Sequence, residues 1–268
     1  MSKSPGEFLN SFFGMEGKVA LVTGSTAGLG RSIVETLCQA GCTVLVNGRS
    51  EERTDKACQE IIAKFGKDPS CVISAPGDTS KPEEVKQIIE TIKASSNGKL
   101  DILINNAGIN LPEAKFEDQY SEDQWNKISK VNISGPLNMT HAALVLLKQS
   151  KAGRIINMSS MIAHVGSPTN NLYTMTKSAM LLFTKSLAAQ LAMTKITVNS
   201  ISPGAFKTDM NAKFTQDEKA LKEIESSIPM GRMGDPQELA GAVLFTASDA
   251  ASYMTGSDIC VDGGFVAV

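Results

Sequence analysis

The segment Lys18-Val-Ala-Leu-Val-Thr-Gly-Ser-Thr-Ala-Gly-Leu-Gly30 joins an apolar run of strand length to a turn rich in glycine, and a helical pattern follows over residues 28–40. A glycine turn between a strand and a helix lets backbone N–H groups and the helix N-terminus approach a pyrophosphate. Three residues separate Gly24 from Gly28, so the spacing departs from Gly-x-Gly-x-x-Gly. The segment still predicts the first strand, turn and helix of a dinucleotide-binding unit.

Strand-length apolar runs and helical patterns alternate along the rest of the chain. The predicted strands cover residues 18–22, 43–47, 71–75, 101–105, 154–158, 196–201 and 258–261. The predicted helices cover residues 28–40, 51–65, 81–94, 121–149, 172–192 and 236–247. Because continuous apolar strands separated by helices are typical of a parallel sheet covered on both faces, we expect an α/β fold with a doubly wound, Rossmann-type parallel sheet.

Two of these helices have a capping signature at their start. Ser80-Lys-Pro-Glu83 and Asp235-Pro-Gln-Glu238 each place an N-cap residue three positions before a glutamate that can bond back to the N-cap N–H. Pro236 also suits the first position of a helix. We interpret both motifs as structural, without a role in catalysis.

The length of 268 residues suits one α/β domain, and no linker or internal repeat divides the chain. We expect residues 1–268 to form a single dinucleotide-binding domain with an N-terminal extension over 1–16. Two segments, 109–120 and 203–232, interrupt the alternation. Since ligands of open α/β sheets bind beyond the carboxyl ends of the strands, these segments are candidate substrate walls, with 203–232 as a substrate loop or lid. The alternative for both is a solvated surface loop.

The composition argues against several classes of function. With 42% hydrophobic and 20% charged residues and a net charge of −2, the chain resembles a soluble globular protein without the basic excess that attracts nucleic acid or an anionic membrane. No apolar run reaches the ~18–20 residues of a membrane span. Pro5 and Glu7 interrupt the N-terminal region, where a secretory signal needs an apolar segment. We expect a cytoplasmic protein with no nucleic-acid or membrane partner.

Residue spacing gives little support to metal or disulfide chemistry. The five cysteines form no Cys-x-x-Cys pair, which favours free thiols in a reducing compartment. Only His141 and His164 are available to a metal centre or a Ser-His-Asp site, and no His-x-x-x-His spacing occurs. We expect no metal, and we interpret His164 as a pocket wall and not as a catalytic residue.

Tyr173-Thr-Met-Thr-Lys177 places a phenol and an ammonium one helical turn apart, and Ser160 lies 13 residues before the tyrosine. Positions i and i+4 share one face of a helix. A lysine beside a tyrosine favours the phenolate, and a phenol with an ordinary pKa of ~10 needs such help to act as an acid or base near neutrality. By itself the pair is also compatible with an exposed lysine over a half-buried tyrosine.

Several motifs occur together in a particular order: the glycine turn, Asn105-Asn-Ala-Gly108, Asn132, Ser160, Tyr173 and Lys177. In this order and spacing the sequence strongly resembles the short-chain dehydrogenase/reductase family, in its shorter, single-domain branch, from about residue 18 to residue 261. Pro203-Gly204, Thr208 and Val261-Asp-Gly-Gly264 add to the resemblance. The resemblance implies a single oxidoreductase domain that reduces a carbonyl group, or oxidises an alcohol, by hydride transfer with a nicotinamide cofactor.

The resemblance implies a role for each of four catalytic residues. Tyr173 would protonate the developing alkoxide, Lys177 would lower the pKa of that tyrosine and bind the nicotinamide ribose hydroxyls, and Ser160 would hydrogen-bond the substrate oxygen. Asn132 would hold a water connected to Lys177; the alternative is a helix asparagine bonded to its own backbone. Ser159 competes with Ser160 because neighbouring strand residues face opposite ways, and the family spacing selects Ser160.

The residues after the second predicted strand indicate which dinucleotide is bound. By resemblance, Gly48 takes the acidic position of NAD-preferring members. Arg49 takes the basic position of NADP-preferring members, where a guanidinium can receive a 2′-phosphate. Thr26, Asn47 and Ser50 are further candidate donors. The sequence therefore favours NADP over NAD, the alternative being that Arg49 is an ordinary solvated residue.

The resemblance extends the cofactor site to the ends of other strands. Asp78 matches the residue whose carboxylate contacts the adenine, and the backbone of residues 105–108 would lie along the adenosine half. The full expected cofactor-binding set is Gly24, Thr26, Gly28, Leu29, Gly30, Asn47, Arg49, Ser50, Asp78, Thr79, Asn105, Ala107, Gly108, Tyr173, Lys177, Pro203, Gly204, Phe206 and Thr208.

The expected function is an NADP-dependent oxidoreductase that reduces a ketone or oxidises a secondary alcohol. Candidate small-molecule substrates are a sugar or polyol, a keto-acid and a 3-oxoacyl compound, bordered by Phe206 and by the segments 110–115 and 216–227. Two alternatives remain open: a catalytically silent nucleotide-binding scaffold or sensor of the same fold, and a methyltransferase with a glycine-rich first turn. The complete set of Ser160, Tyr173 and Lys177 disfavours both.

We expect the protein to be a homo-oligomer, either a tetramer or a dimer. By resemblance, related chains pair through the helices predicted at 121–149 and 172–192, and again through the C-terminal strand and its neighbouring helix. Leu181, Leu182, Leu187 and Leu191 also give the second of these helices more apolar surface than one sheet face needs.

Overall fold

One parallel sheet forms the centre of the molecule. In the computed structural model, which describes residues 4–111, 121–208, 211 and 217–268, the strands follow the order β3-β2-β1-β4-β5-β6-β7. Their bounds are β1 Val19–Val22, β2 Thr43–Val46, β3 Val72–Ser74, β4 Ile102–Asn105, β5 Gly153–Met158, β6 Ile196–Pro203 and β7 Asp258–Val261. All neighbouring strands are parallel, and the inner strands β1, β4 and β5 are buried along their length. The predicted doubly wound parallel α/β fold is confirmed.

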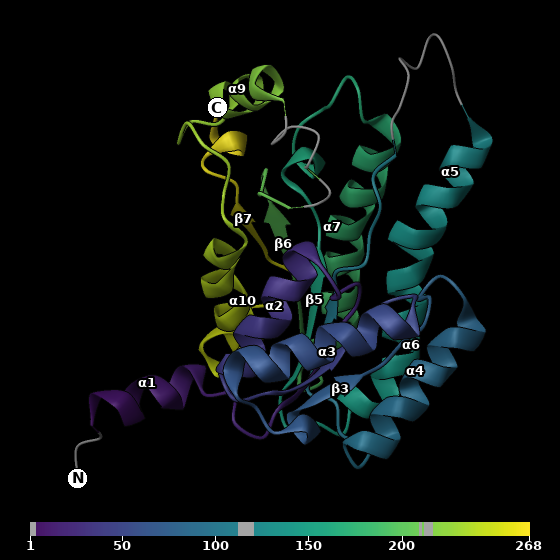
Figure 1. Ribbon diagram of the computed structural model, residues 1–268, viewed down its shortest axis with the longest axis vertical. Helices are drawn as coiled ribbons and strands as arrows, with labels where there is room; N and C mark the ends of the chain where they lie inside the picture. The colour runs from purple at the N-terminus through teal and green to yellow at the C-terminus, as the bar shows by residue number, and fades with distance from the viewer. Residues whose placement is uncertain (1–3, 112–120, 209–210, 212–216) are drawn as a thin grey trace.

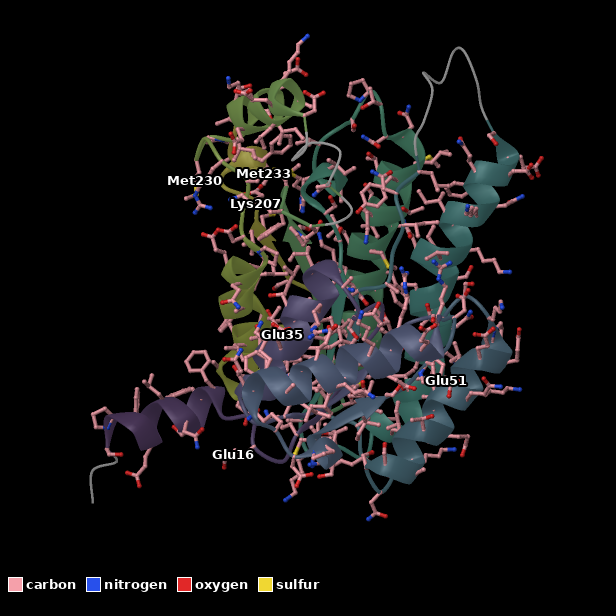
Figure 2. All side chains as sticks on the ribbon, viewed as in Figure 1. Glu16, Glu35, Glu51, Lys207, Met230 and Met233 are labelled. Atoms are coloured by element: carbon pink, nitrogen blue, oxygen red, sulfur yellow. The ribbon has the colours of Figure 1, made fainter. Side chains whose placement is uncertain are left out.

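Helices cover both faces of this sheet (Figure 1). One layer contains α2 Gly28–Gln39, α3 Glu51–Phe65 and α10 Ala240–Ala247. Glu35, labelled on α2 in Figure 2, pairs with Lys64 of α3 at 2.8 Å. The other layer contains α4 Pro82–Ser95, α6 Gly135–Leu147 and α7 Asn171–Leu191. The remaining α-helices of the described residues are α1 Pro5–Phe13, α5 Glu122–Ser129 and α9 Glu218–Ser227.

Strands β2 and β3 are added on one side of β1, and the crossover from β3 to β4 places the remaining strands on its other side. Because β1 and β4 lie side by side, the loops that follow them meet at the carboxyl edge of the sheet, where Asn106 donates to the Gly24 carbonyl at 3.0 Å. Such a switch point is where open α/β sheets bind ligands. The topology therefore places the glycine turn and the Asn105–Gly108 motif at the expected ligand edge.

Three predicted elements differ from the structure in detail. The helix expected over 121–149 contains a π turn, η2 Lys130–Ser134, between α5 and α6. The helix expected from residue 236 starts as a 3₁₀ turn, η5 Pro236–Leu239, and Asp235 forms the expected capping box. The capping box expected at Ser80 is wrong. Lys81 is the N-cap of α4, because the Ser80 N–H donates to Asp78 Oδ1 within the preceding turn.

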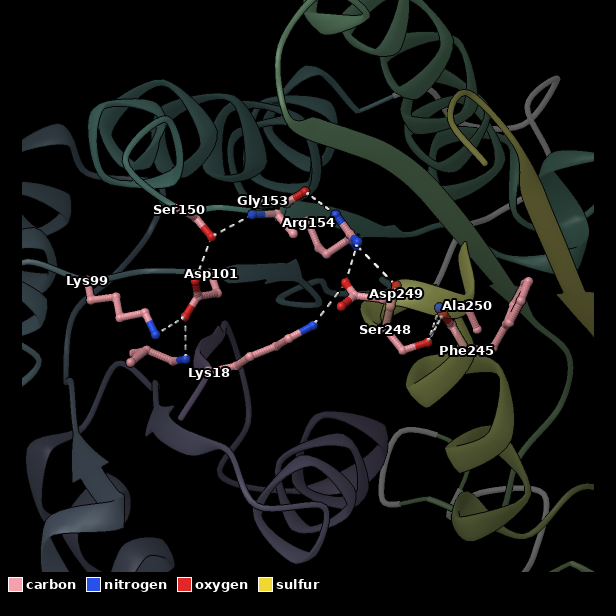
Figure 3. Close-up of polar contacts among 12 residues, drawn as sticks. Lys18, Lys99, Asp101, Ser150, Gly153, Arg154, Phe245, Ser248, Asp249 and Ala250 are labelled. Carbon is pink, nitrogen blue, oxygen red and sulfur yellow. Dashed lines mark hydrogen bonds and ion pairs between the residues drawn. The ribbon is translucent and has the colours of Figure 1, made fainter. Parts of the chain in front are cut away.

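Polar side chains brace the amino-terminal edge of the sheet (Figure 3). Asp101, just before β4, is buried and accepts hydrogen bonds from the Val19 N–H at 2.9 Å and from the Ser150 hydroxyl at 2.5 Å. Arg154 of β5 is also buried and pairs with Asp249 at 3.0 Å. These contacts join three neighbouring strands and the segment after α10 at the edge opposite the glycine turn.

The apolar surface of α7 is smaller than the sequence suggested. Leu187 and Leu191, which we expected to widen an oligomer surface, are buried in the core, so this part of the expectation is wrong. They share a helical face with Met180 and Thr184, which also point to the sheet. Leu182 lies on the outer face and is 68% exposed. None of the helices within the described residues is both long and apolar enough to cross a membrane.

Candidate active site

The glycine turn needs glycine where the loop after β4 packs against it. Gly24 has a φ of +62°, and an added Cβ there would lie 2.8 Å from Ala107 Cα. An added Cβ at Gly30 would lie 2.4 Å from both the Asn106 side-chain amide and the Gly24 carbonyl. The turn is therefore closely packed, and its backbone stays accessible only because these residues lack side chains.

The N-terminus of α2 has the properties of an anion site. Its N-cap, Ala27, makes no side-chain capping bond, and its first turn carries no acidic residue. The first backbone N–H groups of a helix have no partner within the helix and donate readily to phosphate oxygens. Thr208 lies beside Gly28, at 3.8 Å from an added Cβ, while Leu29 packs against the core. These residues fit the pyrophosphate of a dinucleotide.

Asn47 braces the turn and is not available as a donor to a ligand. Its Oδ1 accepts from the Gly24 N–H at 3.2 Å. Its amide nitrogen donates to the Ala75 carbonyl at 2.8 Å and to the Gly77 carbonyl at 3.1 Å. The expected donor role of this side chain is wrong, because two backbone carbonyls already take both of its N–H groups. Asn47 acts by positioning Gly24.

Gly48 and Arg49, the residues expected to discriminate NADP from NAD, directly follow β2. Arg49 is exposed at the end of β2, whereas Gly48 is buried, and an added Cβ at Gly48 would lie 2.6 Å from the Thr26 methyl group. Burial alone would raise the pKa of the Asp78 carboxyl, but hydrogen bonds from Ser80 and the positive charge of Arg49 hold that pKa below its ordinary value. Arg49 is therefore close enough to Asp78 to stabilise its carboxylate. The Thr26 side chain occupies part of the space that an acidic side chain at residue 48 would need.

Three other expected cofactor residues are bonded within the scaffold. Ser50 is the N-cap of α3 and accepts from the Arg53 N–H at 3.3 Å. Thr79 is buried beneath α6, and Asn105 crosses from β4 to β5 by donating to Asn157 Oδ1 at 2.8 Å. These contacts fix the strand ends from which the site is built.

Thr23 is a positioning residue that the sequence analysis missed, and it joins the glycine turn to Asn106. The Asn106 amide donates to the Thr23 carbonyl at 2.8 Å and to the Gly24 carbonyl at 3.0 Å. In return, Thr23 Oγ1 accepts from the backbone N–H groups of Asn106 and Ala107, at 3.0 Å each. The two adjacent asparagines were the available signal: Asn105 ends β4 and bonds within the sheet, whereas Asn106 bonds to the glycine turn.

The catalytic candidates converge at the carboxyl edge of the sheet. Ser160 follows β5 and Tyr173 lies in the first turn of α7, and their side chains share a hydrogen bond. Ser159 is buried and points away, with its hydroxyl donating to the Lys177 carbonyl at 2.9 Å. The structure therefore brings Ser160, and not Ser159, to the tyrosine, as the spacing predicted.

Lys177 lies one turn further along α7 and is 5% exposed. Its Nζ is 5.7 Å from the centroid of the Tyr173 ring and donates to the Met158 carbonyl at 2.8 Å. Burial lowers the pKa of Lys177 to about 8. Burial also raises the pKa of Tyr173 to about 12, and the hydrogen bond with Ser160 opposes only part of this increase. Desolvation of the phenol is therefore the largest effect on the Tyr173 pKa, and a lowering of that pKa by Lys177 stays a prediction.

Asn132 lies in the π turn η2, and its side chain comes close to Lys177 beside Gly108. Its Oδ1 accepts from the Ile109 N–H at 2.8 Å, and its Nδ2 donates to the Ile109 carbonyl at 2.9 Å and to Thr176 Oγ1 at 3.1 Å. The alternative that Asn132 bonds its own backbone does not hold. An added Cβ at Gly108 would lie 3.4 Å from both Asn132 Oδ1 and Lys177 Nζ, so the two side chains meet beside this glycine.

The residues that follow β6 border the site, and at Gly204 it is the backbone that packs closely against a neighbouring segment. Gly204 follows Pro203, and an added Cβ there would lie 2.6 Å from Asp262 Cα. Phe206 is 3% exposed and packs its ring against Gly234. Little of the ring can face a substrate, and its role as a substrate wall stays a prediction. Parts of the expected walls at 110–115 and 216–227 lie outside the described residues, but α9 covers 218–227.

The site thus combines a helix N-terminus behind a glycine turn with a Ser–Tyr pair and a buried lysine. A family model described as enoyl-(acyl carrier protein) reductase matches residues 24–266. The chain belongs to the short-chain dehydrogenase/reductase family. As a member of this family, the protein is an oxidoreductase that acts on CH–OH or keto groups.

Curated relatives and solved structures give the same family. The chain is 39% identical over 253 residues to a 3-oxoacyl-[acyl-carrier-protein] reductase, FabG, of Aquifex aeolicus, covering 93% of this chain and 98% of the relative. It is 36% identical over 256 residues to FabG of Vibrio harveyi, covering 95% and 99%. A gluconate 5-dehydrogenase of Burkholderia cenocepacia in complex with NADP and tartrate superposes with a TM-score of 0.90 at 31% identity, over 97% and 99% of the two chains. RhlG of Pseudomonas aeruginosa with NADP gives 0.89 at 31% identity, over 96% and 99%.

A second cluster of reactive side chains lies beyond the Ser160 loop. His164 Nε2 lies 2.9 Å from Asp258 Oδ2 and 3.6 Å from Cys260 Sγ. These are three residue types that bind metals. Spacing along the chain did not predict the cluster, because 94 residues separate His164 from Asp258. No pair of ligands close together in the chain signals this cluster.

Proposed function

We propose that the protein is an NADP-dependent reductase of 3-oxoacyl thioesters. The observation that carries this proposal is the hydrogen-bonded pair Ser160–Tyr173 beside the buried Lys177, at the strand edge where the glycine turn ends. The substrate class comes from the FabG relatives, which match nearly the whole chain at 36–39% identity. Such a pair has no evident use in a methyltransferase or in a silent nucleotide-binding scaffold.

In the proposed mechanism, the bound dinucleotide supplies the hydride. The Ser160 hydroxyl donates a hydrogen bond to the substrate carbonyl oxygen and orients it, and Tyr173 transfers its phenolic proton to that oxygen. A pKa of about 12 keeps Tyr173 protonated at neutral pH, which is the form that a proton donor needs.

Lys177 and Asn132 support the proposed proton donor. The Lys177 ammonium stabilises the phenolate that remains after proton transfer, and its place beside Gly108 suits it to bind ribose hydroxyls. Asn132 positions the backbone of Ile109 next to this lysine through two hydrogen bonds. A water held by Asn132 would connect Lys177 to solvent, which stays a prediction.

The preference for NADP rests on charge and on space around residue 48. Arg49 offers a guanidinium to a 2′-phosphate, with Ser50 beside it as a further hydroxyl donor. An added Cβ at residue 48 would lie 2.6 Å from the Thr26 methyl group, so the acidic side chain that would bind the ribose hydroxyls of NAD requires Thr26 to move. Two structural relatives were solved with NADP, which agrees with this preference.

A sugar acid is a second candidate substrate, because the gluconate 5-dehydrogenase has a TM-score of 0.90 with this chain. NADPH oxidation by the purified protein, followed with a 3-oxoacyl thioester, a keto-sugar acid and a 2-enoyl thioester, separates the candidates. We expect kcat/KM to be highest for the 3-oxoacyl thioester. A higher value for the sugar acid would change the substrate class, and turnover of the enoyl compound alone would contradict keto reduction. No turnover of any compound would favour the silent scaffold.

A further inference from the structure

The His164, Asp258 and Cys260 cluster has the geometry of a metal-binding site. The three pairwise separations are 2.9 Å for Nε2 to Oδ2, 3.6 Å for Nε2 to Sγ and 3.6 Å for Sγ to Oδ2. A point equidistant from three atoms at these separations lies about 2.0 Å from each of them, compared with ~2.0–2.3 Å for Zn²⁺ bonds to N, O and S ligands. The atoms can therefore surround one ion with little movement.

The register of the last two strands builds this cluster. Asp258 and Cys260 are two residues apart on β7, so they face the same side of the sheet. They pair in register with Ser200 and Ser202 of β6. His164 comes from the loop that follows η3 Met161–Ala163 and reaches the same side, where its Nε2 also lies 3.2 Å from Ser202 Oγ. Three separate segments thus place their polar atoms around one point.

The surroundings orient the carboxylate toward that point. Ser200, which is 1% exposed, donates its hydroxyl to Asp258 Oδ1, so Oδ2 is the oxygen directed at His164 and Cys260. Ligating carboxylates in metal sites are held in this way by hydrogen bonds from residues behind them. In the single chain Cys260 and His164 are both exposed, so an ion can reach them from solvent.

We propose that His164, Asp258 and Cys260 bind one Zn²⁺ ion through Nε2, Oδ2 and Sγ. A set of one nitrogen, one oxygen and one sulfur suits zinc, whereas Mg²⁺ and Ca²⁺ prefer oxygen ligands alone. Binding releases the thiol proton of Cys260 to solvent, because the thiolate is the ligand. The ion ties the loop that carries Ser160 to the edge strand β7. The proposal is independent of the substrate and of NADP.

Zinc binding can be measured on the full-length protein after chelation and reduction. Titration with ZnCl₂ against a chromophoric chelator gives the affinity, and metal analysis after dialysis gives the stoichiometry. We expect one ion per chain in the wild-type protein. Cys260→Ala and His164→Asn should each weaken binding more than about a hundredfold, since each removes a direct ligand. Ser200→Ala should weaken binding by about 10–100-fold, because it frees the carboxylate.

The chain provides matched controls for this experiment. Cys71→Ala removes a cysteine of intermediate exposure from η1 Pro69–Cys71, and His141→Asn removes the exposed histidine of α6. Both controls should bind zinc like the wild-type protein. Co²⁺ in place of zinc should give a thiolate charge-transfer band that Cys260→Ala abolishes. The proposal is wrong if the wild-type protein binds less than one ion per chain, or if the controls weaken binding as much as the ligand variants.

Discussion

Tyr173 and Lys177 share one face of α7, and burial has the largest effect on the pKa of both. The tyrosine is hydrogen-bonded to Ser160 of the neighbouring loop, and the lysine donates to the Met158 carbonyl of β5. The spacing of the two residues predicted their proximity. It could not predict that burial is the largest effect on both pKa values, because burial depends on the strands and loops that close over them.

Tyr173→Phe tests the proposed proton donor. The variant deletes the phenolic hydroxyl and keeps the ring that lies near Lys177, so NADPH affinity should change less than about threefold. Turnover should fall by about 10²–10⁴-fold, the usual contribution of a positioned acid. Steady-state kinetics and fluorescence titration with NADPH measure the two effects separately. A variant that keeps more than a tenth of the wild-type rate would exclude Tyr173 as the donor.

Arg49→Ala tests the choice of cofactor. A charge-assisted hydrogen bond contributes about 1.5–3 kcal/mol, so losing the guanidinium should raise the Kd for NADPH by about 10–150-fold. The Kd for NADH should change little, because NADH lacks the 2′-phosphate. Lys56→Ala, on the exposed surface of α3, is a control that should affect neither value. Equal affinity of the wild-type protein for NADPH and NADH would refute the proposed preference.

Gly48→Asp should not create an NAD site unless Thr26 is changed as well. The added Cβ would lie 2.6 Å from the Thr26 methyl group, and Thr26→Ser removes that methyl group while keeping the hydroxyl. We expect the double variant with Thr26→Ser to bind NADH more tightly than the Gly48→Asp variant alone. Thr26→Ser alone is the control. If the single Gly48→Asp variant binds NADH equally well, steric exclusion at residue 48 is not the reason for the preference.

The pKa of Lys177 predicts a descending limb in the pH profile of reduction. Burial lowers that pKa to about 8, so the ammonium is present below this pH and is lost as the pH rises through it. Because kcat/KM reports groups of the free enzyme, kcat/KM for NADPH should decline above about pH 8. Lys177→Arg stays charged in this range and should lose the limb at about 8, even if its rate is lower overall. The same limb in both proteins would assign it to another group.

Elements with a strong local signal were predicted well, and those that depend on distant contacts were not. Alternating apolar strands and helices predicted the sheet, and Asp235-Pro-Gln-Glu238 predicted a capping box that the structure contains. The π turn over Lys130–Ser134 has no comparable local signal, since Asn132 is held there by Ile109 and Thr176. The same limit applies to Ser80, whose N–H is taken by Asp78.

The polar contacts at the amino-terminal ends of the strands should contribute to the free energy of unfolding and not to cofactor binding. Asp101→Ala leaves the buried Val19 N–H and the Ser150 hydroxyl without their acceptor, which should cost about 2–4 kcal/mol in the free energy of unfolding. Asp55→Ala, at an exposed position of α3, should change it by less than about 0.5 kcal/mol. Urea unfolding measures both variants. Because Asp101 lies at the edge opposite the glycine turn, KM for NADPH should not change, and an increase in KM would contradict this division of roles.

At the scale of the whole molecule, one edge of the sheet gathers residues from segments far apart in the chain. The carboxyl ends of β1, β4, β5 and β6 bring Gly24, Gly108, Ser160 and Gly204 to one edge. Parallel topology made this convergence predictable, because all strand ends of one polarity meet at the same edge. The cluster of His164 with Asp258 and Cys260 follows from the same topology but required the register between β6 and β7, which no local pattern contains.

The outer helices predict how copies of the chain associate. On α6 and α7, Leu137, Val145, Met175 and Leu182 are 41%, 56%, 54% and 68% exposed, which is unusual for apolar side chains on neighbouring helices of one face. We expect these helices to pack against a second copy in a two-fold symmetric dimer or tetramer, as in an obligate apolar interface.

Leu182→Lys tests this association, because the substitution places a charge in the centre of the expected interface. A buried, unpaired ammonium is strongly unfavourable, so the variant should dissociate at protein concentrations where the wild-type protein stays associated. Gln59→Lys, at an exposed polar position of α3, is the control and should not change the assembly. Light scattering during size-exclusion chromatography gives the mass of each protein. A wild-type mass near 28.5 kDa at micromolar concentration would show that the chain is a monomer, and that the apolar patch on α6 and α7 has another partner.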